Sequence, residues 1–168
     1  MDATSAPRRQ RGFTVIELMI GAVVMLLLAA TALPQIFDAR ARHRVASAAE
    51  TLAGDLQKAR WAAIDRGQPV YVTFGGQGES RCYAIATRPD CPCDGKADAC
   101  VLKAARPQGL QWEVAQESFA FDPRLGGTSP GTVASFSLGR YAVRVDAEAV
   151  GHADVCASGA AMAGVKAC

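Results

Sequence analysis

One carboxylate, Glu17, stands inside a long apolar stretch of the sequence, where a charged group requires a partner. The stretch runs from Phe13 to Leu33, which is 21 residues and enough to cross a hydrocarbon core of roughly 30 Å as a helix. An unpaired acid in such a segment costs on the order of a few kcal/mol. On a helix that begins at Phe13, this residue and Glu17 share one face. Cleavage before Phe13 would create an ammonium group near Glu17, and a neighbouring subunit would supply the same group.

The residues before the apolar stretch are basic, and they include Arg8, Arg9 and Arg11. They favour a cytoplasmic N-terminus, with the rest of the chain outside. Two simpler interpretations exist. Ala30-Thr31-Ala32 fits the cleavage site of a secretory signal peptide, but the stretch is longer than the usual apolar region and contains a charge. A plain membrane anchor would leave Gly12 and Glu17 without a role.

Six cysteines are the second group of residues that could carry chemistry, and they are Cys82, Cys91, Cys93, Cys100, Cys156 and Cys168. An even number beyond an export segment indicates disulfides in an oxidising compartment. Cys156 and Cys168 are expected to pair, because both lie in a terminal segment with little else to hold it, and such a loop closure is worth about 3 kcal/mol. A bond between Cys91 and Cys93 would be strained. Cys82 therefore pairs with one of these two and Cys100 with the other, and the sequence leaves the choice open.

A zinc site and CxC redox chemistry are the alternatives for the cysteines. No second CxxC or His pair accompanies them, and periplasmic thiolates would face oxidation. We expect no metal and no cofactor. The polar residues of the C-terminal half form no recognised catalytic spacing either, so no enzyme is expected. These residues are the acids Asp122, Asp146, Glu148 and Asp154 and the bases Arg144 and His152.

The formal net charge of +2 arises within residues 1–12, which carry three Arg and one Asp. The rest of the chain has 15 basic and 15 acidic side chains. Bulk charge therefore gives no support for nucleic-acid binding.

A single helix from about Phe13 to Asp65 must position these groups, and Pro34 is expected to kink it because proline lacks the backbone donor. Apolar residues at helical spacing predict that the second half packs on a sheet, and they are Val45, Ala49, Leu52, Leu56, Ala59 and Ala63. The opposite, polar face is expected to carry Glu50, Asp55, Lys58 and Asp65. Trp61 and Ile64 are expected to be packing residues. Arg66-Gly67 is expected to end the helix.

Runs of β-branched and aromatic residues predict strands after Pro69. A hairpin is expected over 70–86, with strands 70–74 and 81–86. Short strands are expected at 110–114 and 118–121, and a second hairpin, 132–138 and 141–145, turns at Gly139-Arg140. A last strand near 152–156 precedes the tail. Residues 88–99 and 122–131 are expected to be loops.

The segment Gly12-Phe13-Thr14-Val15-Ile16-Glu17-Leu18 resembles the class III leader junction of type IV pilins and type II secretion pseudopilins. The resemblance implies a leader peptide of residues 1–12, which a prepilin peptidase removes between Gly12 and Phe13. It implies methylation of the new Phe13 amine. It also implies that Glu17 pairs with a neighbour's N-terminus during assembly.

The rest of the chain resembles the GspH/FimT-type minor pilins, on residues 59–67 with Val70, on Phe121-Asp122-Pro123 with the Gly-rich loop, and on the terminal loop from Cys156 to Cys168. The resemblance implies an α+β, type IV pilin-like fold, with a long N-terminal membrane-spanning helix packed on a small antiparallel β head. Residues 13–33 would be the transmembrane and filament-core helix, 34–66 its amphipathic continuation, and 67–168 a periplasmic head of two small sheets.

The expected function is that of a minor pilin in type IV pilus assembly, at or near the filament tip. Its partners would be other minor and major pilins or pseudopilins, the prepilin peptidase and the inner-membrane assembly platform. The chain would cross the inner membrane once, with the head in the periplasm, and then enter the pilus or pseudopilus. The alternatives are an H-type pseudopilin of a type II secretion system and a DNA- or surface-binding adhesin.

The resemblance suggests DNA binding as a possible property, but the residues at the matching position argue against it. Some FimT-type pilins use a Gly-Arg-x-Arg stretch before the penultimate Cys, where this chain has Gly151-His152-Ala153-Asp154. Both arginines are lost, and Asp154 would repel phosphates. Arg140 and Arg144 are the remaining candidates for DNA contact, and nucleic acid is not an expected partner.

Overall fold

The computed structural model describes residues 13–94 and 99–168, without side-chain detail at 31–34 and Glu79. The chain divides into two compact units, residues 1–39 and 40–168. Helix α1, Val15–Arg66, belongs to both units and includes Pro34, whose kink stays a prediction. Gly12 and the expected leader lie outside the described residues.

The helix begins two residues later than expected. Thr14 precedes it, and the hydroxyl oxygen of Thr14 accepts a hydrogen bond of 3.3 Å from the backbone N–H of Glu17. This is the geometry of an N-cap, which satisfies one of the free donors of the first turn. Phe13 therefore lies outside the helix, and the prediction that Phe13 and Glu17 share a helix face was wrong.

The apolar stripe of α1 is confirmed. Its six residues are each at most 1% exposed, and they are Val45, Ala49, Leu52, Leu56, Ala59 and Ala63. The predicted end at Arg66-Gly67 is also confirmed, because Gly67 takes a φ of 62° and its N–H donates to the Ile64 carbonyl. A positive φ is open to glycine without the steric cost that a side chain would bring.

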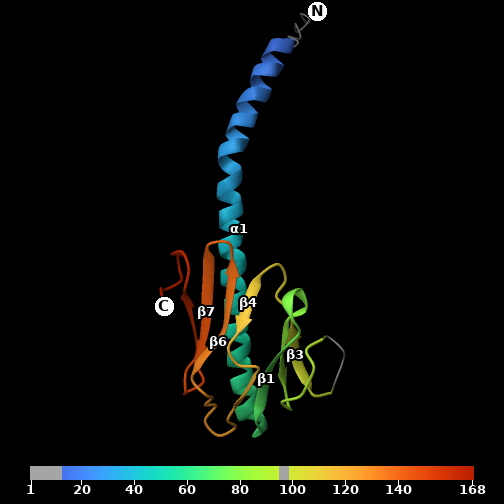
Figure 1. The fold of residues 1–168 in the computed structure, drawn as a ribbon, viewed down its shortest axis with the longest axis vertical. Helices are drawn as coiled ribbons and strands as arrows, with labels where there is room; N and C mark the ends of the chain where they lie inside the picture. The colour runs from blue at the N-terminus through green and yellow to red at the C-terminus, as the bar shows by residue number, and fades with distance from the viewer. Residues whose placement is uncertain (1–12, 95–98) are drawn as a thin grey trace, which may run out of the picture. The chain divides into compact units, whose positions relative to one another are not determined.

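Two four-stranded antiparallel sheets complete the head (Figure 1). Sheet A has the order β3-β2-β1-β5, with β1 Val70–Gly75, β2 Cys82–Ala86, β3 Val101–Ala105 and β5 Ser118–Phe121. Sheet B has the order β4-β6-β7-β8, with β4 Gln111–Val114, β6 Gly131–Leu138, β7 Tyr141–Ala147 and β8 Ala153–Ala157. A short 3-10 helix, Gly78–Ser80, lies between β1 and β2.

The predicted strands all have counterparts, and both predicted hairpins are antiparallel pairs. Strand β3 was not predicted. Its sequence, Val-Leu-Lys-Ala-Ala, contains one β-branched residue, and it lies at an edge of sheet A, where it alternates between half-buried and exposed positions. Pairing with β2 therefore fixes this strand more than its own residue preferences do.

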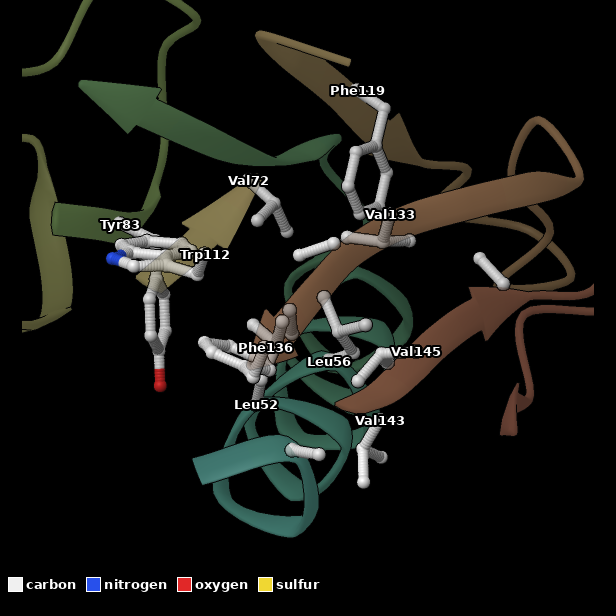
Figure 2. Packing of buried hydrophobic residues seen from close by; sticks show 14 of the residues in the cluster. Leu52, Leu56, Val72, Tyr83, Trp112, Phe119, Val133, Phe136, Val143 and Val145 are labelled. Atoms are coloured by element: carbon white, nitrogen blue, oxygen red, sulfur yellow. The ribbon is translucent and has the colours of Figure 1, made fainter. Parts of the chain in front are cut away.

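Side chains from both sheets and from α1 form one core in the head. Figure 2 shows Leu52 and Leu56 of α1 close to Phe136 and Val145 of sheet B, with Val72 of sheet A beyond. The rings of Trp112 and Phe136 stack at 5.4 Å between neighbouring strands of sheet B. Full burial of each such apolar side chain contributes about 1.5–3 kcal/mol.

Strand β2 is buried on both faces, which is unusual for a strand in a small head. Tyr83 and Ile85 point into the main core, whereas Cys82, Ala84 and Ala86 pack against Cys91, Cys93 and Cys100 of the following loop. The structure pairs Cys82 with Cys93 and Cys91 with Cys100, which selects one of the two combinations that the sequence left open. The disulfide-linked loop therefore forms two small clusters with sheet A, one of Cys82, Ala84 and Cys93 and one of Ala86, Cys91 and Cys100.

The C-terminal tail folds back on β8. The structure joins Cys156 to Cys168, the pair that the sequence favours. The backbone N–H of Ala157 donates to the Lys166 carbonyl at 2.7 Å, and that of Cys168 donates to the Ala157 carbonyl at 3.1 Å. The tail thus occupies backbone groups on the outer side of an edge strand.

Two further predictions for α1 were wrong. Asp55, expected on the polar face, is 1% exposed. Trp61, expected to be a packing residue, is 59% exposed, whereas Ile64 is half-buried.

Candidate functional site

The N-terminal part of α1 is an apolar surface that no other described residue of the chain buries. Its large side chains are exposed, among them Phe13 at 83%, Ile16 at 67% and Leu18 at 69%. The helix is long and apolar enough to cross a membrane, and its apolar segment has no buried share in the structure. Contiguous apolar surface on this scale marks a segment that lipid or other protein covers.

Glu17 lies in the first turn of this surface, and its side chain is exposed. Within the described part of the chain, no cation forms an ion pair with it. An acid in the first turn interacts favourably with the helix dipole, and Thr14-x-x-Glu17 is the spacing of a capping box. This local role was not predicted, although the Thr-x-x-Glu spacing is visible in the sequence. The cap engages the backbone of Glu17 and leaves its carboxylate available to a partner.

The head contains a carboxylate of a different kind at Asp55. Tyr83 of β2 donates a hydrogen bond of 2.7 Å to Asp55 Oδ2, and Lys103 of β3 donates one of 2.6 Å to Oδ1. Lys58 lies 3.5 Å from the same oxygen but is mostly exposed. We call Asp55, Tyr83 and Lys103 the Asp55 cluster. It joins α1 to two strands of sheet A.

The protonation of the Asp55 cluster follows from this geometry. Burial of Asp55 would raise the pKa of its carboxyl group, but hydrogen bonds from Lys103 and Tyr83 and the charges of Lys103 and Lys58 outweigh it, so the pKa lies below the ordinary value of 3.8. Burial, together with the Asp55 carboxylate, raises the pKa of Tyr83. Asp55 is therefore charged and Tyr83 neutral at physiological pH, which suits a structural link.

Three of the four acids considered as catalytic candidates, Asp122, Asp146 and Asp154, have local structural partners. Asp122 accepts hydrogen bonds from the backbone N–H groups of Arg124 and Leu125, at 2.8 and 3.2 Å. Asp154 pairs with Lys166 at 2.7 Å. In the ranges that the structure describes, no group of three His, Cys, Asp or Glu side chains is placed to hold a metal ion. All six cysteines are in disulfides.

The two arginines named as DNA-contact candidates lie on or beside β7. Arg144 forms an ion pair of 2.9 Å with Asp146, whose backbone neighbour across the ladder is Asp154. The guanidinium of Arg140 lies 5.2 Å from the centre of the Tyr141 ring. This face of sheet B therefore mixes both signs of charge, unlike the cationic surface that phosphate contacts need. That nucleic acid is not a partner of this chain stays a prediction.

Comparison with known families adds two matches. A family model described as type II transport protein GspH matches residues 48–151, which is more than half of the chain. A model of the prokaryotic N-terminal methylation motif matches residues 7–33, a range that contains Gly12, Phe13 and Glu17. No curated protein and no solved structure matches the chain.

Proposed function

This chain belongs to the GspH family of pilins and pseudopilins, and from that premise we propose that it is a minor subunit of a type IV pilus, located at or near the filament tip. As a family member it assembles with other pilins in a pilus or pseudopilus. Members of this family are structural subunits rather than catalysts. The α+β head with three disulfides is typical of such a subunit.

The methylation motif and the exposed apolar helix indicate membrane anchoring. In the proposed processing pathway, prepilin peptidase removes residues 1–12 and methylates the Phe13 amine. Phe13 to Leu33 then holds the chain in the inner membrane, with the head in the periplasm, where its disulfides form. The inner-membrane assembly platform transfers the subunit from lipid into the filament.

The observation that carries the proposal is the state of Glu17. It is a carboxylate at the start of an apolar helix surface, and the described part of the chain supplies it with no cation. In a filament, the N-terminal ammonium of a neighbouring subunit would meet it in a medium of low dielectric, where an ion pair is strong. The head core is complete without this segment, so the acid is not needed for the fold of residues 40–168.

Substitution of Glu17 tests the proposal. Glu17→Gln keeps the shape and removes the charge. We expect the variant to be processed, inserted and disulfide-bonded as normal, while its amount in sheared filaments falls about tenfold, because about 1.4 kcal/mol of pairing is lost. Glu50→Gln, which removes an exposed carboxylate from the same helix, is the matched control. Equal incorporation of both variants would contradict the role of Glu17.

Intact mass of the protein from membranes tests the processing step. A chain that starts at methylated Phe13 is expected. A chain that starts at Leu33 would instead show signal-peptide cleavage after Ala32, and an uncut chain in cells with an active peptidase would remove the basis of the proposal.

A pseudopilin of a type II secretion system is the second candidate, and the description of the matched family favours it. Deletion of the gene distinguishes the two systems. Loss of surface pili with normal protein secretion supports the pilus, and the reverse supports the secretion system.

A further inference from the structure

An open groove with a volume of about 660 Å³ lies in the head between α1 and the connection from β3 to β4. Helix residues from His43 to Thr51 form one wall, and residues 105–110 form the other. All of these residues belong to the unit of residues 40–168. We call this the α1–β4 groove.

The charge of the groove has one sign. Its lining includes two cations, Arg44 and Arg106, which are both exposed, and it includes no acidic residue. The chain after residue 12 has equal numbers of basic and acidic side chains. The groove differs from this average, because its charged side chains are all cations. Such a site attracts an anionic partner and repels a cationic one.

The floor of the groove is apolar. Ala48 and Leu110 are half-buried and pack against the core, and the buried Tyr83 ring lies below. The Tyr83 hydroxyl already donates to Asp55, so the floor offers a ring and aliphatic carbon rather than a free hydrogen-bond donor. An apolar floor with a charged rim is the usual anatomy of a protein–protein contact.

We propose that the α1–β4 groove binds an acidic, partly apolar segment on the head of another subunit of the same filament. The inference rests on the proposed function, since it needs a filament neighbour. The apolar floor favours a polypeptide over a nucleic acid, because DNA would present hydrated phosphates and would gain little from Ala48 and Leu110. The lining has a single Phe, Tyr or Trp ring, that of Tyr83, and its burial leaves no open platform on which a base could stack.

Photo-cross-linking in cells that assemble the filament tests this site with the full chain. A photoreactive residue at Thr51, which is exposed and lines the groove, is compared with one at Glu50, which is exposed on the same helix and does not line it. We expect cross-links from position 51 to a different subunit of the filament, mapped to a peptide that contains Asp or Glu. Position 50 is expected to give no such product.

Charge variants then test the cations. Arg44→Glu combined with Arg106→Glu is expected to lower the cross-link yield about tenfold, a change of about 1.4 kcal/mol. Arg44→Lys combined with Arg106→Lys is expected to retain most of it, because the charge remains. Intact disulfides in both variants, measured by mass after thiol blocking, show that the head has folded.

Several results would overturn the inference. They are cross-links from position 51 to phospholipid, to a second copy of this chain or to nothing, and a yield that the glutamate variants leave unchanged. Salt-sensitive DNA binding that the glutamate variants abolish would also overturn it. Each is distinguishable from failure of the proposed function, because the amount of the protein in sheared filaments is measured in the same cells. If the chain is absent from filaments, both proposals fail.

Discussion

Tyr83 and Asp55 are 28 positions apart in the sequence, yet the Tyr83 hydroxyl lies 2.7 Å from Asp55 Oδ2 in the interior of the head. Lys103 reaches the other carboxylate oxygen at 2.6 Å from a second strand. A carboxylate with a side chain that is 2% exposed depends on these two donors, because an unpaired buried charge is strongly destabilising. The hydrogen bond from Tyr83 to Asp55 therefore helps to fix where sheet A packs on α1.

Removal of one donor measures the strength of this link. Tyr83→Phe should lower the free energy of unfolding by about 2 kcal/mol, because it deletes a hydrogen bond to a buried charge. Lys58→Met is the control, since Lys58 is 73% exposed and 3.5 Å away, and it should change stability by no more than about 0.5 kcal/mol. Urea unfolding of the full chain in detergent, followed by tryptophan fluorescence, compares the two. An equal loss of unfolding free energy in both variants would show that the buried hydrogen bond stabilises the head no more than the exposed Lys58 does.

The Asp55 cluster also predicts a dependence of stability on pH. The pKa of Asp55 is lower in the folded state than its ordinary value of 3.8, so the contribution is fully present above pH 3.8 and is lost as pH falls through the folded pKa. Acid titration of the unfolding midpoint should show a steeper loss in the natural chain than in Asp55→Asn, which cannot titrate at this position. Parallel curves for the two proteins would assign the acid sensitivity to other groups.

Two loops of the head meet at a pair of glycines near Arg60. Gly151 has a φ of 80°, and a Cβ added there would meet the Gly126 carbonyl oxygen and lie 3.0 Å from Arg60 Cδ. Gly151→Ala should therefore cost about 3 kcal/mol through steric overlap and backbone strain. Thermal melting of the full chain measures the loss.

Two further glycines serve as controls for Gly151→Ala. Gly164 has a similar φ of 83° but open space around it, so Gly164→Ala should cost only about 1 kcal/mol. Gly54 is helical with open space, and Gly54→Ala should raise stability by up to about 1 kcal/mol. A different rank order among the three variants would contradict the packing of the two loops.

The disulfides should differ in what their removal exposes. Replacement of Cys91 and Cys100 by Ser should destabilise the head by about 3 kcal/mol, and the loop covering Ala86 should become sensitive to protease. Replacement of Cys156 and Cys168 should instead release the tail, while the loop stays protected. Limited proteolysis with mass mapping separates these patterns. Cleavage at the same sites in both variants would contradict the conclusion that each disulfide holds its own segment.

The elements of the fold could be predicted because they depend on local pattern. The stripe from Val45 to Ala63 follows from helical spacing, and the turn at Gly139-Arg140 follows from two alternating runs. Asp55 could not be placed, because its burial depends on Tyr83 and Lys103, which are 28 and 48 positions away. Spacing alone puts Asp55 beside the stripe, where a lone acid is normally solvated.

Other features of the site depended on similar long-range information. Strand β3 is held by its pairing with β2, and the choice of Cys93 as the partner of Cys82 follows from how the loop folds over that strand. Trp61 lies on a helix that packs well, but at a position that no strand covers. Periodicity cannot tell a covered aromatic residue from an exposed one when the covering element is unknown.

The free edge of a β-sheet can pair with a strand of another molecule. Strand β8 ends sheet B, and an unprotected edge there could recruit the edge of another head into an unwanted continuous sheet. Residues 166–168 lie along that edge: the Lys166 carbonyl accepts from the Ala157 N–H, and the Cys168 N–H donates to the Ala157 carbonyl. The disulfide between Cys156 and Cys168 holds the tail in this position, so the backbone of Ala157 is not open to the edge strand of another head.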